Sequence, residues 1–344
     1  MTLSPKHRAQ LLAKIQQEKT DNTSASNLAQ KIMDGDLAAL SKGITFIESK
    51  AFKHRAFANE LVDLCLPKSG KSFRIGITGV PGVGKSTFIE SFGYYLIQEE
   101  NKKLAVLAID PSSQVSGGSI LGDKTRMEKL TQQADVFIRP SPSADSLGGV
   151  ARKTRESIIL CEAAGYDTIF IETVGVGQSE TEVKGMVDFF LLLMLAGAGD
   201  ELQGIKRGIM EMADGMCITK ADDGNEKNAN KAAQNYRNAL HLFPPHPANW
   251  VPEVMVTSST EGVGLQRTWG NLEKYQRHTI SNGFLAENRK NQSEFWLKST
   301  MHNLILDQHF GDPKFQEKYQ LLIEQVREGQ TSPFRGAEEL LQQF

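Results

Sequence analysis

The sequence predicts an α/β fold, in which a mainly parallel β-sheet is flanked by helices and carries helical extensions at both ends. Short apolar, β-branched runs alternate with helical patterns from about residue 73 to residue 259. Several of these runs are apolar throughout, as in strands covered on both faces. Outside this region, apolar residues recur at helical spacing. We therefore expect an N-terminal helical extension at 1–70, a central domain at 71–265 and a C-terminal helical arm at 266–344.

The predicted elements follow one another in a regular order. In the N-terminal extension, helical patterns occupy 4–19, 25–36, 37–50 and 53–66. The strand-like runs lie at 73–78, 104–110, 136–140, 167–173, 189–195, 215–219 and 253–259. Amphipathic segments at 294–310 and 314–329 and a short helix from Ser332 complete the arm. The helical segments between the runs imply crossover connections within one sheet.

Composition excludes several classes of protein. The formal net charge is −2 and no long basic run occurs, so we expect no nucleic-acid partner. The most apolar run, 189–199, is shorter than the roughly 20 residues that span a bilayer, and the N-terminus shows no signal peptide. The three cysteines are too far apart for a zinc site and fit free thiols. A cytoplasmic protein without a membrane partner is expected.

A phosphate-binding loop follows the first predicted strand. The sequence GVPGVGKS at 79–86 matches the pattern G-x-x-x-x-G-K-[ST]. Its glycines let backbone N–H groups surround phosphates, and the following helix adds a favourable dipole. Lys85 can reach the β- and γ-phosphates, and Ser86 can bind Mg²⁺. A dinucleotide fingerprint would need glycine or alanine in place of Thr87. The predicted phosphate contacts are Gly79, Val80, Pro81, Gly82, Val83, Gly84, Lys85, Ser86 and Thr87.

Two later segments predict a pocket for guanine. TKAD at 219–222 is a variant of the guanine motif N-K-x-D and ends a predicted strand. Asp222 would accept hydrogen bonds from the base, and the stem of Lys220 would pack on it. TSST at 257–260 follows the next strand, and Ser258, Ser259 and Thr260 are the candidates to support the base. An ordinary surface loop is the alternative for both segments.

Three acidic residues are candidates for the Mg²⁺ site. Asp110 and Glu172 close two predicted strands, where carboxylates reach the ligand side of a parallel sheet. Asp123 lies on a glycine-rich segment that could close on the γ-phosphate. Mg²⁺ prefers a few such oxygens together with waters. Capping and turn roles are the alternative for these acids.

These segments resemble a known family. GVPGVGKST, AIDPSS, GGSILGDKTRM, TIFIETVGVGQSE and AGAGDELQGIK are similar to the MeaB-type GTPases, which belong to the SIMIBI class of P-loop GTPases. Members of that family are G-protein chaperones of adenosylcobalamin-dependent methylmalonyl-CoA mutase and its relatives. The resemblance covers nearly the whole chain.

The resemblance implies an activity, a site and partners. It implies GTP hydrolysis to GDP, with Lys85, Asp110, Asp123 and Glu172 as catalytic residues and with Ser86 and these three acids around Mg²⁺. It also implies a first switch at 112–123, a second switch at 172–180, which contains Gly175, Gly177 and Gln178, and a third switch ending at Lys206. The implied partners are an adenosylcobalamin-dependent acyl-CoA mutase, such as methylmalonyl-CoA mutase, and a second copy of the chain bound through the C-terminal arm.

The sequence departs from the family pattern at a few positions, and rival functions stay open. Ala196 replaces a proline and Thr219 an asparagine, while Phe189 stands where a smaller or acidic residue is common. None of these changes predicts an inactive site. The main rival is a nucleotide-dependent kinase or ATPase of a basic amino acid transport system, which would prefer ATP. A nickel-inserting GTPase would need Cys or His ligands near the phosphate loop or a His-rich tail, and the sequence has neither. A nucleotide-binding scaffold would not need the intact Lys85, Asp110 and Glu172.

Overall fold

The computed structural model describes residues 24–49, 51–110, 127–142, 147–173, 179–196 and 207–342. By its internal contacts the chain divides into two compact units, Met1–Arg289 and Lys290–Phe344. Among the described helices, none has both the length and the apolar character needed to cross a membrane. The boundaries that the sequence predicts at 70 and 265 remain predictions.

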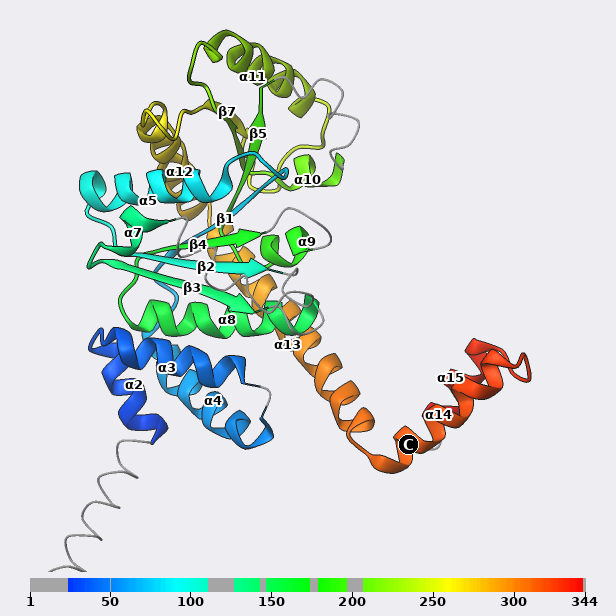
Figure 1. Cartoon of the computed structure of the whole chain (residues 1–344). Coiled ribbons are helices and arrows are strands. Elements are labelled where there is room, and N and C mark those ends of the chain that lie inside the picture. Colours follow the sequence, from blue (N-terminus) through cyan, green and yellow to red (C-terminus); the bar gives the residue numbers. More distant parts are fainter. Residues whose placement is uncertain are drawn as a thin grey trace, which may run out of the picture. The chain divides into compact units, whose positions relative to one another are not determined.

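The first unit is built on a seven-stranded sheet with the strand order β3-β2-β4-β1-β5-β6-β7 (Figure 1). Every pairing between neighbouring strands is parallel. The strands are β1 (Phe73–Gly79), β2 (Leu104–Asp110), β3 (Val136–Pro142), β4 (Thr168–Thr173), β5 (Phe189–Leu195), β6 (Gly215–Thr219) and β7 (Glu253–Val256). The predicted α/β class and the parallel sheet are therefore confirmed.

Helices cover both faces of the sheet. On one face, α5 (Lys85–Glu100) and α12 (Leu265–Ser281) pack side chains such as Phe92 and Trp269 onto the strands. On the other face, α10 (Arg207–Met212) and α11 (Glu226–Leu240) cover β5, β6 and β7. The helices α8 (Leu147–Ala163) and α9 (Ser179–Lys184) contact β2, β4 and β1. This double cover explains why β1, β4 and β5 are almost fully buried.

The N-terminal helices form a further layer against α8 (Figure 1). They are α2 (Ala25–Met33), α3 (Leu37–Glu48) and α4 (Phe52–Cys65), followed by the short turn η1 (Leu66–Lys68). Asp36 caps α3 by accepting hydrogen bonds from two backbone N–H groups. A Cβ on Gly43 would lie 2.9 Å from Leu160, so glycine allows α3 to approach α8 closely. The remaining short helix, α7 (Glu128–Thr131), packs beside α5.

The C-terminal helices are α13 (Phe284–Phe310), α14 (Pro313–Arg327) and α15 (Pro333–Leu341). Asp312 and Ser332 cap α14 and α15, and a proline occupies the first turn of each. Phe315, Leu322 and Leu340 form a small core of the second unit.

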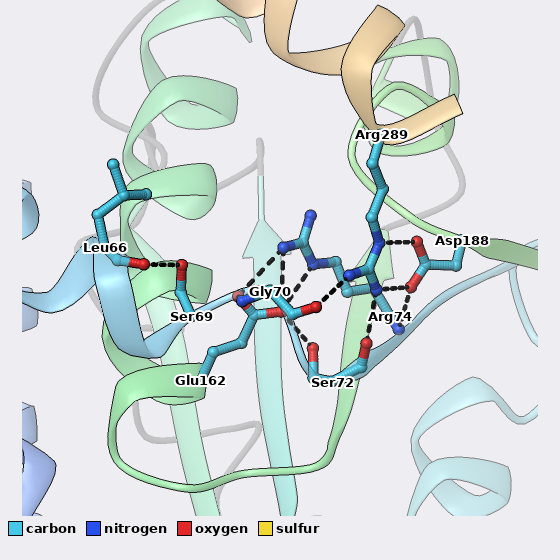
Figure 2. Close-up of polar contacts among 8 residues, drawn as sticks. All are labelled: Leu66, Ser69, Gly70, Ser72, Arg74, Glu162, Asp188 and Arg289. Atoms are coloured by element: carbon cyan, nitrogen blue, oxygen red, sulfur yellow. Dashed lines mark hydrogen bonds and ion pairs between the residues drawn. The ribbon is translucent and has the colours of Figure 1, made fainter. Parts of the chain in front are cut away.

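A network of buried charges joins the start of α13 to the amino end of the sheet (Figure 2). Arg289 donates to Asp188 through Nε at 2.8 Å and Nη2 at 2.7 Å, and also to the carbonyls of Gly70 and Ser72. Beside it, Arg74 donates to both carboxylate oxygens of Glu162 at 3.0 and 3.1 Å. Burial alone would raise the pKa of Glu162, but Arg74 and the donors of Ser72 and Gly70 hold that pKa below its usual value.

Candidate nucleotide-binding site

The phosphate loop connects β1 to α5 at the carboxyl end of the sheet. Gly82 and Gly84 adopt φ values of 78° and 88°, which side chains other than glycine rarely adopt. A Cβ on Gly79 would lie 2.6 Å from the carbonyl oxygen of Leu193, so the loop passes close to the neighbouring strand β5. Val83 is buried beneath the loop. Its remaining predicted contacts, Val80, Pro81 and Thr87, are partly or fully exposed.

Lys85, Ser86 and Glu172 come together at the start of α5. The Nζ of Lys85 donates to the carbonyl of Gly79 at 2.9 Å. The hydroxyl of Ser86 lies 3.5 Å from Oε1 of Glu172, which belongs to β4. Burial lowers the pKa of Lys85, and the carboxylates of Glu172 and Glu180 oppose that shift. A cation, a hydroxyl and a carboxylate thus meet where the loop would hold phosphates.

The candidate base motif begins at the end of β6 and is tied to the phosphate loop. The hydroxyl of Thr219 donates to the carbonyl of Val83 at 2.8 Å, and also lies 3.2 Å from the carbonyl of Met194. Lys220 has a φ of 57°, and its Cε lies 3.8 Å from the point where a Cβ of Gly84 would stand. The stem of Lys220 therefore lies beside the loop, and threonine supplies a hydrogen bond to it in place of the expected asparagine.

Asp222 is held by the loop that follows β7. Its Oδ2 accepts hydrogen bonds from Thr260 at 2.7 Å and from Ser258 at 3.0 Å. These two bonds lower the pKa of Asp222 because they stabilise its ionised form. Ser259 is partly exposed between the two hydroxyl residues. The loop is closely packed at Gly264, where a Cβ would lie 2.2 Å from the carbonyl oxygen of Val256.

Comparison with known proteins identifies the family. Residues 40–314 match the family model described as methylmalonyl-CoA mutase-associated GTPase MeaB. The chain belongs to this family. Because its relatives are GTPases and its fold is that of a P-loop GTPase, the chain is a GTPase that binds guanine nucleotides.

Named relatives span most of this MeaB-type chain. A putative GTPase of Caulobacter vibrioides is 48% identical and the match covers 92% of this chain and 97% of that protein. The GTPase ArgK of Escherichia coli is 43% identical, with 90% and 94% covered. The mitochondrial methylmalonic aciduria type A homolog of Mus musculus is 42% identical, with 91% and 78% covered.

A solved structure shares the fold of this MeaB-type GTPase. A protein described as an LAO/AO transport system kinase superposes with a TM-score of 0.73 and 36% identity. The match covers 92% of this chain and 96% of that one.

Several predicted site residues of this MeaB-type GTPase lie outside the described residues: Asp123, Gly175, Gly177, Gln178, Lys206 and the predicted first switch. Asp110 ends β2 opposite Pro142 of β3, and its side chain also lies outside the described part. In the described ranges, no group of three or more His, Cys, Asp or Glu residues could hold a metal ion. The roles of these residues remain predictions.

Sequence reasoning missed one buried charged cluster. Asp214, just before β6, accepts from Lys184 at 2.6 Å and from His246 at 2.8 Å. These partners are 30 and 32 positions away in the chain. No local pattern predicts contacts between residues so far apart. The one signal in the sequence is that Asp214, a charged residue, directly precedes an apolar strand.

Proposed function

We propose that this GTPase is a chaperone that gates adenosylcobalamin loading of methylmalonyl-CoA mutase or a related acyl-CoA mutase, and protects that enzyme. The match of residues 40–314 to the mutase-associated family carries the proposal. The name of the mouse relative, which refers to methylmalonic aciduria, supports it.

The proposed nucleotide site combines three groups of residues. Residues 79–87 bind the phosphates, and Lys85 offsets charge on the β,γ-bridge and γ-oxygens. Asp222 accepts hydrogen bonds from guanine, while Ser258 and Thr260 fix its carboxylate through the contacts at 3.0 and 2.7 Å. Lys220 packs its stem on the base, and Ser259 lies at the rim.

The residues at the start of α5 fit Mg²⁺. The hydroxyl of Ser86 and the carboxylate of Glu172 lie 3.5 Å apart. Both offer oxygen atoms, which are the ligands that Mg²⁺ prefers. We propose that Asp110 and Asp123 complete the acidic set. When bound, the ion would neutralise phosphate charge during hydrolysis. Ser86 and Glu172 orient the triphosphate end against Lys85, and Asp123 would help to place the attacking water.

The output of the cycle is conformational. The γ-phosphate would order the predicted switches, and hydrolysis would release them. We propose that the third switch, ending at Lys206, passes this change to the mutase. No arginine placed to act on the γ-phosphate is evident in the sequence, so we expect slow basal turnover that the partner accelerates.

Cofactor transfer tests this function. Purified protein, apo-mutase and adenosylcobalamin are mixed with GTP, a non-hydrolysable GTP analogue or GDP, and cofactor uptake by the mutase is followed by absorbance. We expect uptake to depend on which nucleotide is present, and to lose that dependence with the Lys85→Ala variant. Uptake that is the same with every nucleotide would contradict the chaperone role. Phosphate transfer from ATP to a protein would instead favour the kinase function named for the solved relative.

A further inference from the structure

The short helix α9 lies directly on the strand that leads into the phosphate loop. A Cβ on Gly76 of β1 would lie 2.9 Å from Cγ1 of Val183 in α9 and 3.2 Å from Val187 just beyond it. The absence of a side chain at Gly76 therefore allows α9 to pack tightly on β1. A shift of α9 would therefore move β1 at Gly76, three residues before the phosphate loop begins at Gly79.

The first turn of α9 carries a buried acid. Glu180 is only 2% exposed. Burial lowers the pKa of Lys85, and the carboxylates of Glu172 and Glu180 oppose that shift. Glu180 thus adds a buried acid to the helix that packs on β1, the strand that leads into the phosphate loop.

The other end of α9 is fixed by an ion pair. The Nζ of Lys184 lies 2.6 Å from Oδ2 of Asp214, whose side chain is fully buried. The Oδ1 of Asp214 contacts Nε2 of His246 at 2.8 Å. Because Nδ1 of His246 accepts from the backbone N–H of Ala248, the hydrogen-bond network assigns the neutral imidazole that donates through Nε2. Within the described residues, Lys184 is therefore the positive partner of Asp214.

Asp214 belongs to the rigid core. Its backbone N–H donates to the carbonyl of Phe190 at 2.9 Å, and its Oδ2 accepts from the N–H of Phe190 at 2.6 Å. Its carbonyl accepts from the indole of Trp250. Burial by itself would raise the pKa of Asp214, but the ion pair with Lys184 and the hydrogen bond from His246 outweigh it and lower that pKa. The ionised carboxylate of Asp214 is thus held in the core and forms the ion pair with Lys184.

A third contact holds α9 from the side. Arg155 of α8 donates to Glu182 at 3.0 Å. Two charged residues of α9 are therefore bound to different parts of the molecule: Glu182 to α8 and Lys184 to the residue just before β6. A single turn and a half of helix would not hold its position by backbone hydrogen bonds alone.

We propose that Lys184 and Asp214 are positioning residues for GTP hydrolysis, which fix α9, and with it the buried Glu180, against the strand that leads into the phosphate loop. Neither residue touches the nucleotide. The inference rests on the assignment of Lys85 to the phosphates. It adds to the proposed function a connection between α9, which begins within the predicted second switch, and the strand that ends in the base motif.

The test compares variants of Lys184 by steady-state GTP hydrolysis and thermal unfolding. Lys184→Met removes the charge and keeps the stem. We expect kcat to fall about ten-fold and KM for GTP to change less than about two-fold, because the base and phosphate contacts remain. Lys184→Arg should restore most of kcat, since this side chain lies on the wall of a cavity of about 520 Å³ that has room for the larger group.

The matched control is Lys274→Met. Lys274 of α12 forms an ion pair with Glu253 of β7 at 2.9 Å, and its side chain is 63% exposed. The loss of this exposed pair should leave kcat unchanged. If Lys184→Met does not fold, Lys184→Gln carries the same expectation. A folded Lys184 variant without the charge but with unchanged kcat would overturn the proposal, even if its melting temperature fell.

A double variant separates positioning from an independent effect. If Lys184 acts through Glu180, then Glu180→Gln combined with Lys184→Met should lose no more kcat than the worse single variant. Losses that multiply would overturn the proposal. Unchanged GTP affinity in Lys85→Ala would instead overturn the phosphate assignment itself, so the two failures are distinguishable.

Discussion

Asp222 is the residue on which nucleotide choice depends. Guanine presents an N1–H and an exocyclic amine, both donors, and a carboxylate accepts from both. The bonds from Thr260 and Ser258 are both made to Oδ2 of Asp222, which leaves Oδ1 to accept from the base. Asp222 follows two positions after Lys220, whose stem lies beside Gly84. The base contact and the phosphate loop are thus parts of one site.

Asp222→Asn should change the base preference of the site from guanine to xanthine. We expect GTP affinity to fall about 100-fold, because two hydrogen bonds to a charged acceptor are lost. Xanthosine triphosphate, which carries a carbonyl in place of the amine, should bind the variant as well as GTP binds the original protein. Titration with fluorescent analogues measures both. Asp223→Asn is the control, since Asp223 is an exposed neighbour. Equal weakening for both nucleotides would exclude Asp222 as the base-binding residue.

At the scale of elements, charged contacts at the amino end of the sheet join β1, α8 and α13. Arg74 and the side chain of Glu162 are almost fully buried, and both oxygens of Glu162 are bonded. Since Arg74 helps to keep the pKa of Glu162 low, the folded state gains stability while the carboxylate is ionised. That gain is present above the unfolded pKa of about 4.3 and is lost as pH falls through the lower folded value.

Arg74→Met should therefore destabilise the protein in a pH-dependent way. Removing one member of a buried ion pair costs about 3 kcal/mol in the free energy of unfolding at neutral pH. In the variant, Glu162 binds a proton at a higher pH, so the difference in unfolding free energy between the two proteins should narrow as pH falls from 7.5 to 5. Urea denaturation at both values measures it. The exposed Arg277→Met is the control. A difference that does not vary with pH would contradict the role of Glu162.

Elements and local motifs were predictable from the sequence, whereas contacts between elements were not. The parallel sheet follows from apolar runs such as 189–195, and the phosphate loop from contiguous residues with fixed spacing. Thr219 could be assigned a hydrogen bond but not its partner, Val83, which lies 136 positions away. The pair of Arg289 and Asp188 spans 101 positions. Such partners depend on how helices cross the sheet, which residue patterns do not encode.

At the scale of the whole molecule, we propose that the C-terminal helices hold two copies together. Large apolar side chains are exposed along the second unit, with Leu297 73% and Phe334 82% exposed. The others are Phe295, Met301, Leu304, Ile305, Leu306, Phe310, Leu321 and Leu341. A soluble monomer rarely exposes this much apolar surface in one region, and a second copy would cover it.

Leu297→Glu together with Phe334→Glu should shift the protein from dimer to monomer, because two charges would be buried in the interface. Light scattering after size-exclusion chromatography gives the mass. The control is Leu242→Glu, which changes a residue that is 76% exposed in the first unit. A wild-type protein already at the mass of one chain would contradict the dimer, as would a double variant that still has the mass of two.

The most direct test of the central claim is the rate of GTP and ATP hydrolysis by the purified protein, with and without an adenosylcobalamin-dependent acyl-CoA mutase from the same source. The account predicts slow GTP turnover that the mutase raises several-fold, with ATP inert. GTP turnover that the mutase leaves unchanged would contradict the proposed partnership, and ATP turnover equal to that of GTP would contradict the guanine site built around Asp222.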